Sequence, residues 1–318
     1  MKKYQWILAL VLVLIGWMWT GTTQAQYIIR QQEYDGELNY NLLPDDVDGP
    51  EEEAQFFLNF PEDQLKSAMQ AAGSDVQVTS TTIYLDGKNL AVESETPEGK
   101  TTMVSNSKEG TFYLINWPQK QVLVMSSRDI ADMKAESEKA REQAREQAMQ
   151  NLSPEERKQV EEAEKAEQAN TTAAAAPKAE PTGKKMQKYG FDCTQYLIKK
   201  EDETVSVWAS KEHPDLAERI STLSKEWEEA FAMGDEGEEE EADEWELLPG
   251  RIPVEVRAYQ GGMMGTPEMN VTVITGIEQS KPPAEVFRIP GQSDGFTHQS
   301  MKDLMQQMMQ MMPEGQGQ

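Results

Sequence analysis

The strongest constraint on the fold is a series of short alternating segments between residues 76 and 126. Apolar and polar residues alternate in them, and turn signals such as Asp86-Gly87 and Pro97-Glu98-Gly99 separate them. The last two segments, 112–117 and 122–125, are apolar on both faces, which is typical of central strands covered on both sides. Residues 54–126 therefore predict the first half of a sheet domain.

A second block of strand-like segments fills residues 185–291, which predict the second half of the same domain. The expected strands are 186–189, 193–198, 204–210, 254–258, 269–273 and 286–289. Strands in two blocks, with one clear helix among them, predict an α+β fold with a mainly antiparallel sheet.

That helix is expected over residues 214–233. Pro214 suits a first helical turn and Gly234 suits a helix end. Its apolar residues recur every three or four positions and form one broad stripe: Leu216, Ile220, Leu223, Trp227 and Phe231. Burial of each large side chain contributes about 1.5–3 kcal/mol, so the helix is expected to dock, and the sheet is the obvious surface.

The remaining segments differ in composition. Residues 26–53 are polar and acidic with several turn signals, which predicts a flexible acidic arm. Residues 127–168 are rich in Ala, Glu, Gln and Arg, which predicts a charged helical insertion, either a solvated arm or a coiled-coil surface. Residues 169–184 are expected to form a linker, 235–246 a solvated acidic loop, and 292–318 a tail rich in Met and Gln.

The first 25 residues have the layout of a secretory signal peptide. Lys2 and Lys3 precede an apolar run, and Thr23-Gln24-Ala25 offers small residues at a cleavage site. The apolar run is shorter than the ~20 residues that a spanning helix needs, which favours cleavage after Ala25 over an uncleaved anchor. We therefore expect a bacterial protein that is periplasmic or secreted, with no membrane span after cleavage.

Charge and cysteine content limit the partners. The formal net charge of −26 repels nucleic acid and anionic lipid headgroups, so no nucleic-acid partner is expected. Cys193 is the only cysteine, which excludes an internal disulfide. A lone cysteine in an oxidising compartment is buried, reactive or paired between chains, and burial is the usual state.

The templates of catalysis are missing. The two histidines, His213 and His298, belong to no zinc-binding helix, and one cysteine cannot form a thiolate zinc site. The sequence contains no phosphate loop and no dinucleotide fingerprint. We therefore expect a protein that is not an enzyme and that carries no cofactor.

A methionine stripe in the tail has two interpretations. Met301, Met305, Met308 and Met312 share one face of a helix. Thioether sulfur suits Cu(I), which makes these residues a candidate metal site. The same stripe is also an adaptable apolar surface that could dock on a partner or on the sheet.

Aromatic and apolar residues of the strands and of the helix also have two interpretations. They pack as core, or some of them line a cavity between sheet and helix that holds an apolar ligand such as a lipid. The candidates for such a lining are Phe112, Leu114, Trp117, Trp208, Trp227 and Phe287.

A family resemblance rests on three short segments. The run 188–196, with Gly190, Cys193 and Tyr196, resembles the Gly-x-x-Cys-x-x-Tyr strand entry of an exported bacterial family, domain-of-unknown-function family 4412. A strand with Trp208 follows, as in that family. The segment 285–290 resembles its closing Phe-x-Ile-Pro strand, and 113–125 is similar to its paired strands.

That family is similar to the periplasmic lipoprotein-carrier superfamily, the LolA/LolB-like fold. The resemblance implies a strongly curved antiparallel sheet, an incomplete barrel, with helices covering its concave face. It also implies a hollow that holds acyl chains in the carriers. The expected function is therefore an exported, non-catalytic binding or carrier-like protein. Two alternatives stay open: an envelope protein-interaction module that docks through the helical insertion and tail, and a Cu(I)-binding protein.

Overall fold

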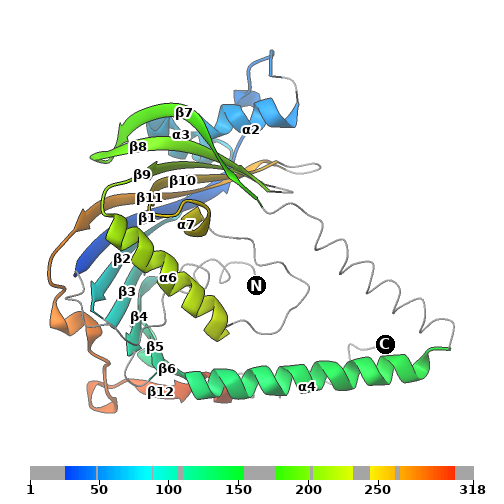
Figure 1. Cartoon of the computed structure of the whole chain (residues 1–318), viewed down its shortest axis with the longest axis vertical. Coiled ribbons are helices and arrows are strands. Elements are labelled where there is room, and N and C mark those ends of the chain that lie inside the picture. Colours follow the sequence, from blue (N-terminus) through cyan, green and yellow to red (C-terminus); the bar gives the residue numbers. More distant parts are fainter. Residues whose placement is uncertain are drawn as a thin grey trace.

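The chain folds into an α+β structure dominated by one large mixed sheet (Figure 1). The computed structural model describes residues 26–47, 49–87, 89–106, 110–153, 177–200, 203–231, 244–261 and 266–304. In these residues twelve strands form a single open sheet, in the order β12-β6-β5-β4-β3-β2-β1-β11-β10-β9-β8-β7. Every neighbouring pair is antiparallel except β12 and β6. The two strand blocks thus form one body, and the predicted fold class is confirmed at this level.

The strands follow the expected segments closely. The first block holds β2 (Val78–Asp86), β3 (Asn89–Thr96), β4 (Gly99–Asn106), β5 (Thr111–Asn116) and β6 (Gln121–Ser126). The second block holds β7 (Ala179–Lys188), β8 (Phe191–Lys199), β9 (Glu203–Ser210), β10 (Ile252–Gln260) and β11 (Glu268–Glu278). The linker predicted over residues 169–184 therefore extends too far, because β7 already begins at Ala179.

The strand that joins the blocks comes from the segment predicted to be a flexible arm. β1 (Tyr27–Glu37) lies between β2 and β11 and pairs with both over most of its length. Tyr27 and Ile29 are buried, whereas the residues that follow are mostly polar. The prediction of an arm over 26–53 is thus wrong, because hydrogen bonds to two distant strands stabilise a segment whose own composition does not indicate a strand.

Two helices fill the long connection from β1 to β2. They are α2 (Pro50–Leu58) and α3 (Glu62–Ala71), preceded by the short η2 (Tyr40–Leu42). Pro50 and three glutamates occupy the first turn of α2, where the fixed proline φ and the helix dipole favour them. Phe57, Leu58, Leu65 and Met69 are fully buried against β1, β10 and β11 and form the second core cluster.

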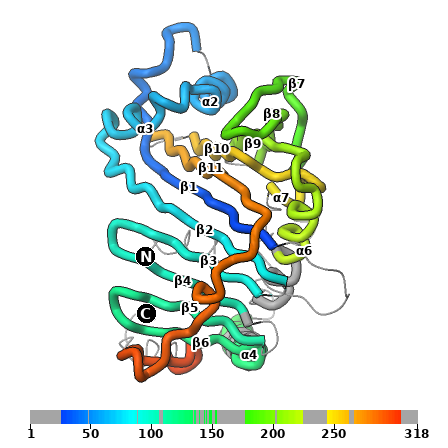
Figure 2. The backbone as a smooth tube through the Cα atoms, turned by 90° about the vertical axis from the view of Figure 1, so that its left-hand side faces the viewer, coloured from blue at the N-terminus to red at the C-terminus, as the bar shows by residue number. Residues whose placement is uncertain are grey.

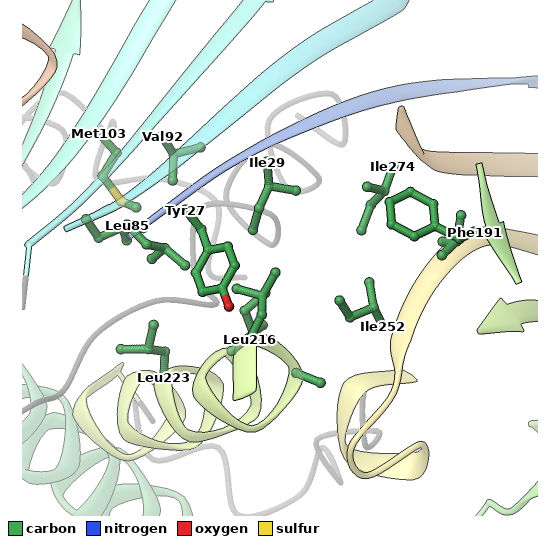
Figure 3. Packing of buried hydrophobic residues seen from close by; sticks show 14 of the residues in the cluster. Tyr27, Ile29, Leu85, Val92, Met103, Phe191, Leu216, Leu223, Ile252 and Ile274 are labelled. Carbon is green, nitrogen blue, oxygen red and sulfur yellow. The ribbon is translucent and has the colours of Figure 1, made fainter. Parts of the chain in front are cut away.

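The helix predicted at 214–233 is α6 (Pro214–Phe231), which packs on the sheet through its apolar side (Figure 3). Its buried residues join side chains from both strand blocks in the first core cluster. On β1–β4 this cluster takes every second residue, and Ala91 and Val104 point to the opposite face. The cluster includes Tyr27, Ile29, Leu85, Val92, Met103, Phe112, Phe191, Trp208, Leu216, Ile220 and Leu223.

The C-terminal segment crosses the opposite face of the first block (Figure 2). It contains η3 (Ala284–Phe287) and η4 (Gln292–Asp294) and ends in β12 (Thr297–Ser300), which pairs in parallel with β6. The expected strand at 286–289 is therefore wrong. Pro283 and Pro290 flank this segment and lack the N–H groups that a ladder requires, so it forms a 3₁₀ turn whose side chains pack on the sheet.

The charged insertion begins as predicted with α4 (Ser127–Asn151), which projects away from the edge of the sheet (Figure 1). A capping box of Ser126 and Asp129 starts the helix, and Ile130 is its buried contact with the first core cluster. Residues 154–168 of the insertion lie outside the described residues, as do most of the acidic loop and the signal segment 1–25. Among the helices that the structure describes, none is both long and apolar enough to cross a membrane.

Candidate functional site

Residues 189 and 190 form a strained hairpin turn between β7 and β8. Tyr189 and Gly190 adopt positive φ angles of 49° and 90°, as a two-residue type I′ turn requires. Glycine tolerates this backbone, whereas a bulky side chain such as tyrosine rarely adopts it. Strain of this kind persists only where surrounding contacts hold the residue in place, so the contacts of the turn mark it as a candidate site.

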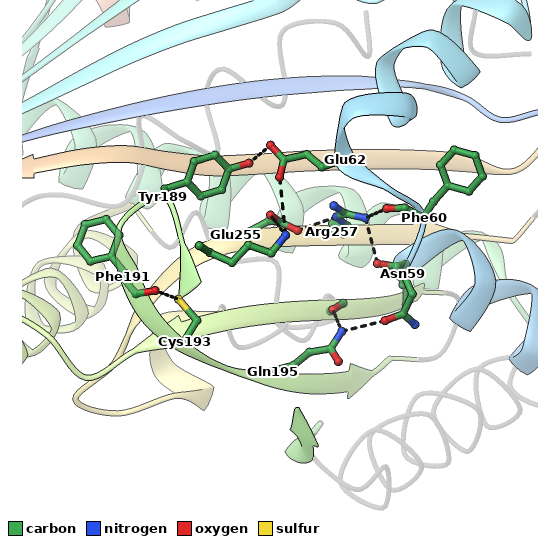
Figure 4. Close-up of polar contacts among 12 residues, drawn as sticks. Asn59, Phe60, Glu62, Tyr189, Phe191, Cys193, Gln195, Glu255 and Arg257 are labelled. Atoms are coloured by element: carbon green, nitrogen blue, oxygen red, sulfur yellow. Dashed lines mark hydrogen bonds and ion pairs between the residues drawn. The ribbon is translucent and has the colours of Figure 1, made fainter. Parts of the chain in front are cut away.

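Those contacts are polar and reach elements far away in the sequence (Figure 4). The Tyr189 hydroxyl donates a hydrogen bond to Glu62, the first residue of α3. The Lys188 ammonium lies 2.8 Å from Glu255 on β10 and 3.7 Å from Glu62. It also lies 5.6 Å from the centre of the Trp208 ring, within reach of a cation–π interaction. The turn is therefore attached to both α3 and β10.

A buried ion pair on β10 completes the cluster. Glu255 is fully buried, and its Oε1 lies 2.8 Å from Nε of Arg257, although these two atoms lack hydrogen-bond geometry. Arg257 also donates to the backbone carbonyls of Leu58 and Phe60, at 3.2 Å and 2.6 Å. It thereby provides donors for the carbonyl of Leu58, which ends α2, and for the carbonyl of Phe60 in the connection to α3.

The cluster contains equal numbers of positive and negative side chains. The carboxylates of Glu62 and Glu255 face the cations of Lys188 and Arg257, so the formal charges cancel. Burial, followed by the hydrogen bond to Glu62, raises the pKa of Tyr189, and burial raises the pKa of Tyr34 to about 12. Both phenols thus stay protonated at neutral pH, and Tyr189 donates its proton to the hydrogen bond with Glu62. The arrangement holds α3, β10 and the turn between β7 and β8 together.

The same turn joins the two main apolar clusters. Tyr189 packs against the first cluster, beneath α6, and against the second cluster, beneath α2 and α3. We name Glu62, Lys188, Tyr189, Glu255 and Arg257 the hairpin clamp. Sequence analysis missed its glutamates and arginine. Glu255 and Arg257 alternate with apolar residues on β10, a pattern that indicates a solvated strand face. They are buried because the segment that joins α2 to α3 lies over Arg257 and the turn between β7 and β8 lies over Glu255.

A second set of polar contacts holds the start of α6. The Tyr27 hydroxyl donates to Asp215 at 2.5 Å, and the Arg219 guanidinium donates to the backbone carbonyl of Gly87. Burial and the contact with Asp215 raise the pKa of Tyr27. These contacts fix the N-terminal part of α6 to β1 and to the turn after β2.

Cys193 lies in the first core cluster beside the clamp. Its thiol is buried, and burial raises its pKa from 9.0 to about 11. The expectation of a buried cysteine is confirmed.

This environment predicts an unreactive thiol. In the native protein at pH 8, a thiol-specific disulfide reagent is expected to react with Cys193 at least ~10²-fold more slowly than in denatured protein, because the group is neutral and covered. A Cys193→Ser variant gives the background rate of the reagent. Rapid native labelling would contradict this prediction.

Between pH 9 and 11 the Cys193 thiol is protonated in the folded protein and loses its proton on unfolding. The contribution of the buried thiol to the free energy of unfolding therefore falls as the pH rises through that window.

The six candidate lining residues do not form one surface. Phe112, Leu114 and Trp208 belong to the first core cluster. Trp117 and Phe287 lie on the opposite side of the sheet, where Trp117 contacts Phe296 edge to face and Phe287 packs on the same cluster. The side chain of Trp227 lies outside the described residues. The prediction that all six residues line one cavity is therefore wrong. Trp117 follows the end of β5 and Phe287 belongs to η3 rather than to a strand, so strand alternation does not place them on the same side as Phe112.

The candidate copper ligands are only partly described. Met301 is half-buried at the start of a short helical turn, and Met305, Met308 and Met312 lie outside the described residues. Lys302 in this turn pairs with Asp132 and Glu136 of α4, at 4.0 Å and 3.2 Å. Within the described chain, no group of three or more His, Cys, Asp or Glu residues could hold a metal ion. The copper site stays a prediction.

Comparisons with known proteins define no family. No family model matches the chain, and no curated protein matches it. A solved structure described as "Structure of PNGF-II in P21 space group" aligns with 89% of this chain at 9% identity and a TM-score of 0.25. The alignment covers 32% of that protein, so this chain spans about a third of its length. This likeness is too low to support an argument about fold or function.

Proposed function

We propose that the protein is an exported, non-catalytic binding protein that shelters an apolar ligand, such as a lipid acyl chain, between the sheet and α6. One observation carries the proposal: a single apolar cluster lies between strands of both blocks and the buried side of one amphipathic helix. In this proposal α6 covers the concave face of the sheet, and the short motifs that resemble the exported family agree with a carrier-like role.

The contacts of α6 suggest how a ligand could enter. Polar contacts hold its N-terminal part, through Tyr27 and Arg219, whereas Leu216, Ile220 and Leu223 make only apolar contacts with the sheet. Apolar contacts are not directional, so an acyl chain can replace them at little cost in free energy. We infer that α6 acts as a cover that moves about its anchored end when a ligand enters.

Ligand uptake tests this proposal directly. Delipidated protein is expected to bind a fluorescent fatty acid with a saturable, one-to-one isotherm at micromolar concentration. Arg219→Ala loosens the anchored end about which α6 moves and is expected to speed uptake several-fold, because the whole helix then leaves the sheet more easily. Glu218→Ala, on the exposed side of the same helix, serves as the matched control. Absence of saturable uptake in every variant would sink the carrier proposal.

A second candidate function is protein interaction through α4. The observation that favours it is the projection of this 25-residue helix from the sheet, beyond its buried contact at Ile130 (Figure 1). Removing residues 134–168 while joining the flanking chain with a flexible linker should leave the sheet folded and abolish capture of an envelope partner. Unchanged capture by the shortened protein would refute this candidate.

A further inference from the structure

The outer edge of the sheet at β7 has a charge opposite to that of the whole chain. The formal net charge of the protein is −26, but residues 178–188 contain four lysines and one glutamate. The lysines are Lys178, Lys184, Lys185 and Lys188. Charges are screened over about 8–10 Å at physiological salt, so a narrow ligand on this edge responds mainly to nearby charges, which are the lysines of this segment and the exposed Asp192 opposite Gln187.

These side chains are mostly open to solvent. Lys178, Lys184 and Lys185 are exposed, and Lys184 also donates to the Asn59 side chain at 3.0 Å. Met186 is 54% exposed, the highest value among the exposed large apolar residues. Lys188 is the exception, because its ammonium is turned inward to Glu255 in the hairpin clamp. The edge thus offers cations together with one apolar side chain.

Over a short stretch of β7, some backbone N–H and C=O groups do not pair with β8. β7 is an end strand of the sheet, and β8 is its only neighbour in the described structure. Lys188 and Phe191 flank the two-residue turn and form a hydrogen-bonded pair, so the N–H and C=O groups of Gln187 and Lys185 point away from β8. Pro181 and the irregular register between Pro181 and Lys185 end this stretch on the other side.

We propose that the β7 edge binds an extended acidic segment of a partner protein by strand addition over Lys185–Lys188. The backbone groups of Gln187 and Lys185 provide the ladder, and the exposed lysines select acidic side chains. The proposal is independent of the apolar ligand beneath α6.

Charge also argues against two other occupants. A second copy of β7 would bring lysines opposite lysines, which disfavours an edge-to-edge dimer. An anionic membrane extends well beyond the screening length and would also meet the acidic remainder of the molecule. A single acidic strand avoids both repulsions. The lysines that disfavour pairing of two β7 edges therefore also favour binding of an acidic strand.

The test uses full-length mature protein and a labelled peptide with three Glu-Val repeats, blocked at both ends. We expect saturable binding by fluorescence anisotropy, weakened at high salt. The double change Lys184→Glu and Lys185→Glu should lower affinity by about tenfold or more. Lys281→Glu, an exposed lysine outside the edge, provides the matched control and should change affinity by less than about twofold.

A second arm separates strand pairing from simple charge attraction and leaves the protein intact. The same peptide with its alternate amides N-methylated keeps its charge but cannot complete a ladder, and its affinity should fall by about tenfold. Equal affinity of the two peptides would overturn the proposal. The proposal would also fail if Lys281→Glu lowered peptide affinity as much as the double variant does. Dimerisation through β7, or tighter binding to vesicles of anionic phospholipid than to the peptide, would overturn it too.

Discussion

Replacing Arg257 by methionine is expected to lower the free energy of unfolding by about 3–5 kcal/mol. The Arg257 side chain is almost fully buried. It provides the cation beside Glu255 and donates to the carbonyls of Leu58 and Phe60, at the end of α2 and just after it. Without it, a buried carboxylate keeps only Lys188 as a close cationic partner. Urea unfolding followed by circular dichroism and tryptophan fluorescence measures the loss.

Two further variants test whether the loss comes from an unpaired buried charge. Arg288→Met removes an exposed arginine whose ion pair with Asp294 lies at the surface, and it should cost less than about 1 kcal/mol. Combining Arg257→Met with Glu255→Leu removes both charges of the pair. We expect the double variant to be more stable than the sum of the single changes implies. A loss below about 1 kcal/mol for Arg257→Met would show that the clamp does not hold α2 on the sheet.

Truncating Leu216 to alanine is expected to cost about 2–5 kcal/mol. Leu216 lies fully buried in the first core cluster, where α6 meets Tyr27 and strands of both blocks (Figure 3). Loss of its side chain removes apolar burial and leaves a cavity that the surrounding strands cannot fill completely. The change in the urea midpoint, at constant slope, gives the stability loss.

The matched control is again Glu218→Ala, which leaves the apolar side of α6 intact and should shift stability by no more than about 0.5 kcal/mol. If Leu216→Ala behaves like this control, α6 does not pack tightly on the sheet. The cluster beneath it would then be loose, and the proposed cover would have no closed state.

Several elements were predictable because their signals are local. The stripe of α6 repeats within a few residues, and Gly87 marks the turn after β2 with a φ of 57°. The two-faced apolar segments of β5 and β6 indicated strands covered on both sides. In the structure, Phe112 on one face of β5 packs in the first core cluster, and the C-terminal segment packs on the other face. Such patterns depend on side-chain period and turn chemistry alone.

The candidate site was not predictable in the same way. Cys193 and Gly190 drew attention to the β7–β8 hairpin, but the partners of its turn lie at Glu62 and Glu255, far away in the chain. Nothing in an alternating strand shows that a charged residue will be buried, because burial depends on which helix is laid over that face. The same limit explains why Trp117 and Phe287 were assigned to one lining with Phe112.

The sequence by itself determined the strands and the amphipathic helix of this protein, because periodicity and turn residues act over a few neighbouring positions. The tertiary structure alone decided that 27–37 is the central strand, that 297–300 runs parallel to β6, and that Glu255 and Arg257 are buried. Each of these depends on pairing between segments far apart in the chain. Their hydrogen bonds and burial outweigh weak local preferences only once the whole sheet has assembled.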